Sequence, residues 1–250
     1  MEWIEIAKKG YDIGAEFGLW KKLRSTLRRR KKILVLGASG TGKTQFVNSL
    51  MNPLSERLGG RQRTISVQRR KVLVDEYPFL LLDTPGQQGD EAKRKPEITN
   101  VLRNPIEGLI NVVCFGYHEA AEAGSADALP KSGRGIANAD YLDRRRRVEL
   151  ALLSEWVPFL DPTSVRWVLT VVTKADLWWP DDKRIQTHYE RGPYAARLDD
   201  FKAKHSVLPY CSVIEPFFGS RTSGRFGDSE RAKLRSHLLE SLIQLTGVTR

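Results

Sequence analysis

From residue 31 onward, short apolar runs alternate with longer segments of helical period, which predict strands and helices respectively. This alternation predicts an α/β fold with a mostly parallel sheet. Strands 66–75 and 78–82 are too close for a helical crossover, so we expect them to form an antiparallel hairpin. The predicted strands are 31–36, 66–75, 78–82, 109–116, 166–172 and 207–212, and the predicted helices are 43–51, 91–103, 141–157, 195–204 and 229–246.

Residues 1–30 form a separate segment with a helical period, because Ile6, Ile13, Trp20 and Leu27 recur every seven residues. The segment ends in a run of Arg and Lys. Aromatic residues on one face and a basic end are typical of a helix that binds a membrane surface or a partner. The alternative is a helix packed on its own domain with the basic run in solvent.

We expect the remaining residues, 31–250, to form one domain. Within it, residues 118–140 are rich in Gly, Ala and Ser and contain few large apolar side chains. This composition predicts a long loop or insertion.

The amino-acid composition limits which binding partners and which cellular compartment we expect. The 250 residues carry a formal net charge of +11. Such a basic surface favours binding to nucleic acid, ribosomes or anionic lipid, although a soluble protein can simply be basic.

Two cysteines, Cys114 and Cys211, provide no disulfide framework and favour a reducing compartment. The sequence contains no run of 18 apolar residues, so we expect no transmembrane helix. We therefore predict a cytoplasmic protein, peripheral to a membrane if the N-terminal helix binds one.

A phosphate-binding motif follows the first predicted strand. Residues 37–44 read Gly-Ala-Ser-Gly-Thr-Gly-Lys-Thr, a complete G-x-x-x-x-G-K-[ST] loop between a strand and a helix. Its glycines allow backbone N–H groups to surround an anion at a helix N-terminus. Lys43 can reach the β- and γ-phosphates of a nucleotide, and the Thr44 hydroxyl can hold Mg²⁺. The loop residues that we expect to bind nucleotide are Gly37, Ser39, Gly40, Thr41, Gly42, Lys43 and Thr44.

A second motif, Asp83-Thr84-Pro85-Gly86, follows the apolar strand 78–82. An aspartate at the end of a buried strand can hold Mg²⁺ directly or through water. Gly86 lacks a side chain, so its N–H can approach a γ-phosphate. By itself, the same sequence is also an ordinary β-turn.

A third motif, Thr173-Lys174-Ala175-Asp176, ends the strand 166–172. The Asp176 carboxylate can accept two hydrogen bonds from guanine, through N1–H and the exocyclic amine. Adenine offers no such pair of donors. The aliphatic stem of Lys174 can lie along the base plane. The alternative is a helix N-cap that follows the strand.

These three motifs, in this order and spacing, resemble the Ras-like and translation-factor-related P-loop GTPases, and Asp-Thr-Pro-Gly is similar to the Era-like branch. The resemblance covers about residues 31–246. It implies a Ras-like P-loop NTPase fold, with a mostly parallel six-stranded sheet, one antiparallel strand and helices on both faces. It also implies GTP and GDP as ligands, with Mg²⁺ as cofactor, held by Thr44, Thr64 and Asp83.

Three further assignments come from the resemblance. Thr64 is the candidate switch threonine, whose hydroxyl and backbone meet Mg²⁺ and the γ-phosphate. Residues 211–213, with Ser212 at their centre, are the candidate fifth motif, but they depart from the usual Ser-Ala-Lys. Gln87 is the candidate for orienting the attacking water, with Gln88 as its rival.

The implied activity is hydrolysis of GTP to GDP and phosphate, slow without a partner, with Lys43, Thr64 and Gln87 in the catalytic centre. Loss of the γ-phosphate would release two switch loops. Other functions stay open. They are a weakly hydrolysing module that assembles, for example as a nucleotide-dependent dimer, a ribosome- or RNA-associated GTPase, and a membrane-surface GTPase with an unknown protein partner.

Overall fold

The computed structural model describes residues 33–51, 68–72, 79–83, 105–119, 124–132, 135–220 and 226–245. A four-stranded parallel sheet forms its centre, with strand order β1-β4-β5-β6. A second pair of strands, β2 and β3, is antiparallel, and β3 packs against β1. The strands are β1 (Ile33–Gly37), β2 (Gln68–Val72), β3 (Phe79–Asp83), β4 (Gly108–Val113), β5 (Trp167–Val172) and β6 (Lys204–Pro209).

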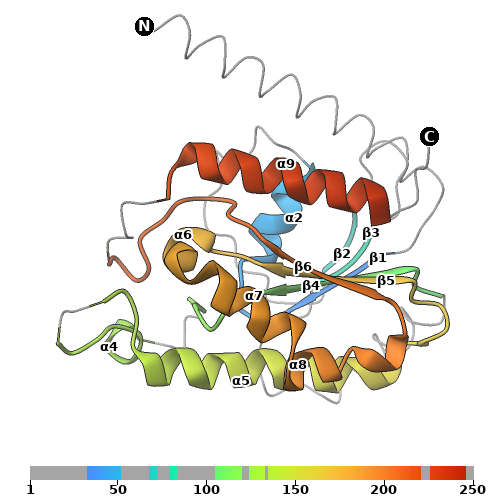
Figure 1. The fold of residues 1–250 in the computed structure, drawn as a ribbon, viewed down its shortest axis with the longest axis horizontal. Helices are drawn as coiled ribbons and strands as arrows, with labels where there is room; N and C mark the ends of the chain where they lie inside the picture. The colour runs from blue at the N-terminus through green and yellow to red at the C-terminus, as the bar shows by residue number, and fades with distance from the viewer. Residues whose placement is uncertain are drawn as a thin grey trace, which may run out of the picture.

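Helices cover both faces of the parallel sheet (Figure 1). On one face lie α2 (Lys43–Met51) and α9 (Asp228–Leu245). On the other lie α5 (Ala139–Trp156), α7 (Asp182–Glu190) and α8 (Pro193–Ala196). The remaining short elements are α4 (Ser125–Ala128), α6 (Ala175–Trp178) and three 3-10 turns at Val157–Phe159, Trp179–Asp181 and Asp199–Phe201.

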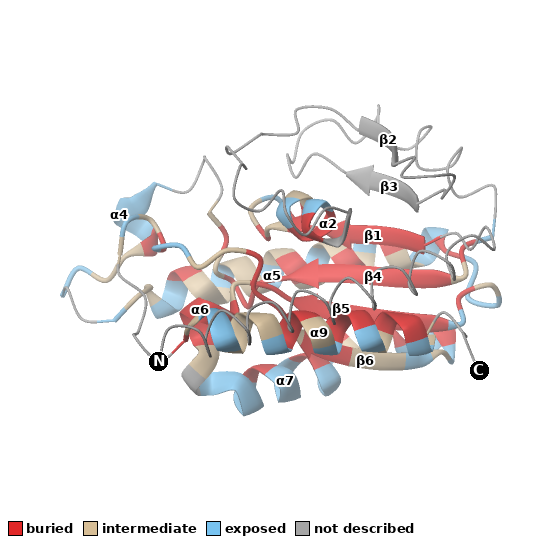
Figure 2. Cartoon of the chain, turned by 90° about the horizontal axis from the view of Figure 1, so that it is seen from above, coloured by how far each residue is buried: buried red, intermediate tan, exposed pale blue. Residues whose placement is uncertain are grey.

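Apolar side chains alternate between the two faces along each central strand, because successive strand residues point in opposite directions. In β1, Leu34 and Leu36 pack in the cluster with α5, whereas Ile33 and Val35 pack in the cluster with α2 and α9. All residues of β1, β4 and β5 are buried (Figure 2). A parallel sheet covered on both faces requires such continuously apolar strands.

The structure confirms the predicted α/β class, the parallel sheet, the 66–82 hairpin and the helices on both faces. The predicted helix 195–204 is wrong: α8 ends at Ala196, and β6 already begins at Lys204. The chain turns there because Lys202 adopts a left-handed conformation with φ of 48°. Helix α7 was not predicted, because only two of its residues, Ile185 and Tyr189, are buried.

Other predictions fall on residues that the structure describes incompletely. The segment 1–30 and the predicted helix 91–103 lie outside the described residues. Within 118–140, the described residues include α4 and the start of α5. None of the helices in the described ranges is long and apolar enough to cross a membrane.

The packing of β4 on β5 yields a test of the core. Gly108 pairs with Trp167, and a Cβ added at Gly108 would collide with the indole ring of Trp167. We therefore expect Gly108→Ala to lower the free energy of unfolding by about 1–3 kcal/mol in urea titrations, as overpacked cores do. The control is Gly124→Ala, where an added Cβ meets nothing within 4 Å; we expect a change within about 0.5 kcal/mol. Equal stability of both variants would contradict the packing of Trp167 on Gly108.

Candidate functional site

Parallel pairing brings the carboxyl ends of four strands to one edge of the sheet. Gly37 of β1 pairs with Val112, Val113 of β4 pairs with Val172, and Val172 pairs with Pro209 of β6. The loops that follow these strands therefore lie together. In open α/β sheets, ligands bind outside this edge.

The loop between β1 and α2 has the backbone conformation of a phosphate-binding loop. Gly40 and Gly42 have φ values of 78° and 82°. Residues with a Cβ rarely adopt such positive φ values. At Gly37, a Cβ would lie 2.6 Å from the carbonyl oxygen of Val112, so this position has no room for one. Helix α2 begins at Lys43, so the loop leads directly into a helix N-terminus.

Lys43 and Thr41 hold the interior of this loop. The ammonium group of Lys43, which is 5% exposed, donates to the carbonyl oxygen of Gly37 at 3.2 Å. The Thr41 hydroxyl donates to the carbonyl oxygen of Ala38 at 2.8 Å. Lys43 therefore lies folded over the loop, where a phosphate would sit, whereas the side chain of Ser39 is exposed. Thr44 occupies the first turn of α2.

Thr173 connects the third motif to the phosphate loop. Its buried hydroxyl lies 2.5 Å from the carbonyl oxygen of Thr41 and 3.0 Å from that of Val113, so one proton serves two carbonyl oxygens. The phosphate loop, the end of β4 and the end of β5 are thus joined at one side chain.

Lys174 takes up an unusual backbone conformation directly after Thr173. Its φ and ψ are 58° and 40°, in the left-handed region, which is uncommon for a residue other than glycine. Its ammonium donates to the carbonyl oxygen of Tyr117 at 2.7 Å and lies 3.8 Å from the carboxylate of Glu119. The loop after β4 therefore fixes the tip of Lys174.

Asp176 is 2% exposed and lies against the loop after β6. One of its oxygens accepts the Cys211 thiol and the other accepts the backbone N–H of Glu215, both at 3.3 Å. Burial raises the pKa of this carboxyl, while these two hydrogen bonds oppose the shift. The thiol is a weak donor and the contact with the Glu215 N–H is long, so stronger donors from a ligand would improve on both.

The predicted fifth motif is brought next to Asp176. Within it, the side chain that contacts Asp176 is that of Cys211. Ser212 is almost fully buried, and its carbonyl oxygen accepts the guanidinium of Arg231 at 3.1 Å. Residues 173–176 and 211–213 therefore form one wall of the candidate site.

The other predicted site residues are less completely defined. Asp83 is the last residue of β3, the strand that packs against β1. Thr64, Gly86 and Gln87 lie outside the described residues. Their roles stay predictions.

One residue near the third motif was missed by the sequence reasoning. Trp178, which is 3% exposed, donates its indole N–H to the carbonyl oxygen of Thr173 at 2.8 Å. Trp178 follows Thr173 by five residues, and the short helix α6 between them carries the indole back to the Thr173 carbonyl oxygen.

Comparison with known proteins finds a family match for part of the chain. Residues 32–131 match the family model described as 50S ribosome-binding GTPase. No curated protein sequence matches significantly. Among solved structures, the chain is similar to the ADP-ribosylation-factor-like small COPII coat GTPase SAR1 from Encephalitozoon cuniculi in complex with GDP, at 15% identity, with 97% of this chain and 93% of that chain covered and a TM-score of 0.48. It is also similar to Toc33 from Arabidopsis thaliana in complex with GDP and Mg²⁺, at 16% identity, with 96% and 93% covered and a TM-score of 0.47.

The family match spans the phosphate loop, β2 and β3. The parallel sheet supplies the strand–loop–helix context that the phosphate-binding motif requires. Residues 32–131 of the chain therefore resemble a GTPase domain.

Proposed function

We propose that this chain is a P-loop GTPase and acts as a guanine-nucleotide switch that binds GTP with Mg²⁺ and hydrolyses it slowly to GDP and phosphate. The observation that carries the proposal is the position of Asp176. It is a buried carboxylate at the carboxyl edge of the sheet, and Thr173 joins its segment to the phosphate loop.

The base-reading step follows from the charge and burial of Asp176. A buried carboxylate requires donors, because an unpaired charge in a low-dielectric site is costly. Guanine supplies two N–H donors on one edge, and these would replace or supplement the weak contacts with Cys211 and Glu215. Adenine supplies no such pair, so an adenine nucleotide would leave the carboxylate poorly paired.

The phosphate-binding step uses the loop between β1 and α2. A bound triphosphate would draw the Lys43 ammonium away from the Gly37 carbonyl oxygen toward the β- and γ-phosphates. The backbone N–H groups of Gly40, Gly42 and the start of α2 would face the same oxygens. Because Thr173 contacts this loop directly, base and phosphates would meet one connected framework.

The residues present fit a magnesium ion, because the predicted ligands are the oxygens that Mg²⁺ prefers. Thr44 lies in the first turn of helix α2 and Asp83 ends the strand beside β1, and Thr64 is the third predicted ligand. When bound, the ion would neutralise charge on the β- and γ-phosphates.

Hydrolysis would need no nucleophilic side chain. A water oriented by Gln87 and the Thr64 carbonyl would attack the γ-phosphorus, and the bond to the β–γ bridging oxygen would break. Lys43 would stabilise the charge that develops on the bridging oxygen. Loss of the γ-phosphate would then release the loops near 55–66 and 84–96, which makes the domain a two-state device.

The partner of this switch is a separate proposal. The net charge of +11 supports an anionic surface, either membrane or RNA, contacted by the basic end of residues 1–30. Assembly into a nucleotide-dependent dimer is the alternative output.

The base assignment predicts a change of nucleotide preference. Asp176→Asn should weaken GTP binding about 100-fold, because two hydrogen bonds to a charged acceptor are lost. The same variant should bind XTP more tightly than the unsubstituted chain does, because the amide can donate to the C2 oxygen of xanthine. Asp182→Asn, an exposed aspartate on α7, is the matched control. Unchanged GTP affinity in Asp176→Asn would refute the base assignment.

The catalytic assignment predicts a separation of binding from turnover. Gln87→Leu should slow single-turnover GTP hydrolysis about 100-fold, because one preorganised group that orients water is removed. Its GDP dissociation constant should stay unchanged. Gln88→Leu, changed in the same way one residue on, should keep the rate. If Gln88→Leu slowed hydrolysis and Gln87→Leu did not, Gln88 would be the residue that orients water. If neither variant slowed hydrolysis, another residue would have this role.

A further inference from the structure

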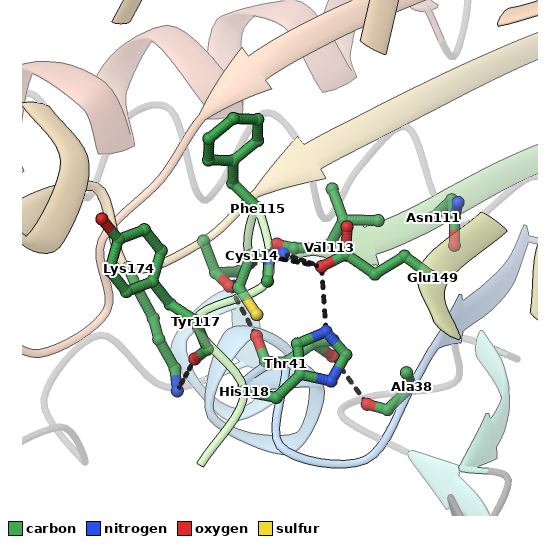
Figure 3. Close-up of polar contacts among 12 residues, drawn as sticks. Ala38, Thr41, Asn111, Val113, Cys114, Phe115, Tyr117, His118, Glu149 and Lys174 are labelled. Carbon is green, nitrogen blue, oxygen red and sulfur yellow. Dashed lines mark hydrogen bonds and ion pairs between the residues drawn. The ribbon is translucent and has the colours of Figure 1, made fainter. Parts of the chain in front are cut away.

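A buried carboxylate anchors the turn that follows β4. Glu149 of α5 is 3% exposed, and its Oε1 accepts the backbone N–H groups of Cys114 at 2.9 Å and Gly116 at 3.2 Å. Its Oε2 accepts the Tyr189 hydroxyl at 2.5 Å, and that hydroxyl accepts the N–H of Phe115 at 3.0 Å. Three consecutive backbone N–H groups therefore end on Glu149 or on its tyrosine partner. Figure 3 shows Glu149 beside Cys114 and His118.

The turn needs this anchor because its backbone is unusual. Phe115 and Gly116 have φ values of 52° and 85°, both left-handed. Consecutive N–H groups in such a turn point inward and form an anion-binding concavity. At Gly116, an added Cβ would collide with the carbonyl oxygen of Leu142, so the turn lies directly on α5. Glu149 is thus an internal anion that occupies the concavity.

The other side of the same turn holds Lys174. The carbonyl oxygen of Tyr117 accepts its ammonium at 2.7 Å. Next to Tyr117, the His118 ring nitrogen Nε2 lies 3.0 Å from Glu149 Oε1, and the His118 carbonyl oxygen accepts the Tyr141 hydroxyl. Residues 114–118 are therefore fixed by Glu149 on one side and support Lys174 on the other.

The same side chains also allow a different interpretation, a metal site. Ligand atoms of Cys114, His118 and Glu149 lie within 4.8 Å of one another. However, both oxygens of Glu149 already accept hydrogen bonds. Burial and the neighbouring Glu149 raise the pKa of the Cys114 thiol well above its ordinary value, whereas a metal ligand must be a thiolate.

The charge state of Glu149 agrees with an anchor. Burial alone would raise the pKa of Glu149, but hydrogen bonds from His118, Tyr189 and Cys114 outweigh burial and lower it. The group is therefore a carboxylate at neutral pH, able to accept from all its donors.

We propose that Glu149 is a positioning residue for guanine-nucleotide binding: it fixes the turn 114–118 and thereby the Tyr117 carbonyl oxygen that orients Lys174. This inference rests on the proposed role of Lys174 along the base. With the anchor removed, the Lys174 ammonium loses its fixed acceptor, and its stem samples conformations that do not lie along a base.

The test is a double-mutant cycle on the full chain, with a fluorescent GDP as probe. Glu149→Gln keeps the side-chain volume but directs an amide toward N–H donors. We expect it to weaken GDP binding about tenfold, within the range of coupling between residues in one network. In a Lys174→Met background, the same change should weaken GDP binding less than about twofold, because Lys174 is already absent.

Two further variants separate positioning from general destabilisation. Tyr189→Phe removes one donor to Glu149 and the acceptor of the Phe115 N–H, and we expect about a threefold loss of GDP affinity with the same dependence on Lys174. Tyr194→Phe is the control: it keeps the ring that packs against Tyr189 and removes only a buried hydroxyl that contacts Asn111, so GDP affinity should not change.

An equal loss of affinity in both backgrounds would overturn the positioning role, as would one equivalent of tightly bound zinc in the unsubstituted chain that Glu149→Gln removes. An unsubstituted chain that binds no GDP would overturn the proposed function as well. Intact GDP binding with additive losses overturns the positioning role alone.

Discussion

Parallel pairing of β1, β4, β5 and β6 is the constraint on which the site depends. The register places Gly37, Val113, Val172 and Pro209 at one edge, so loops separated by more than 170 residues in sequence become neighbours. Strands β1, β4 and β5 are buried on both faces, and a shift by one residue would turn core side chains toward the wrong helices. The geometry of the loops is therefore fixed by the core rather than by the loops themselves.

Two side chains then convert neighbouring loops into one framework. Thr173 joins the phosphate loop, β4 and β5 through a single hydroxyl. Glu149 holds the turn after β4, and that turn holds Lys174. Each link uses a buried polar group with several partners, which rigidifies a site when every member is satisfied. This arrangement would let the proposed base-reading segment and the phosphate loop respond together to one nucleotide.

The sequence was sufficient to predict the fold class, because continuous apolar strands and amphipathic helices produce different periods. It was insufficient for α7, a polar helix that buries only two side chains, and for the start of β6, whose first three residues are not buried.

The motifs at 37–44 and 173–176 were readable because their spacing along the chain encodes local conformation. Glu149 and Trp178 were missed because their roles depend on contacts between distant segments or on the direction of one helix turn. The available signal for Glu149 was a charged residue in the buried stripe of α5, which also contains Tyr141, Leu153 and Trp156.

The central claim is that Asp176 and the phosphate loop form one guanine-nucleotide site. Titration calorimetry of the full chain with GTP and with ATP, in the presence of Mg²⁺, tests it most directly. The account predicts that GTP binds at least about 1,000-fold more tightly than ATP, because adenine leaves a buried carboxylate unpaired. Equal affinities for the two nucleotides would contradict it.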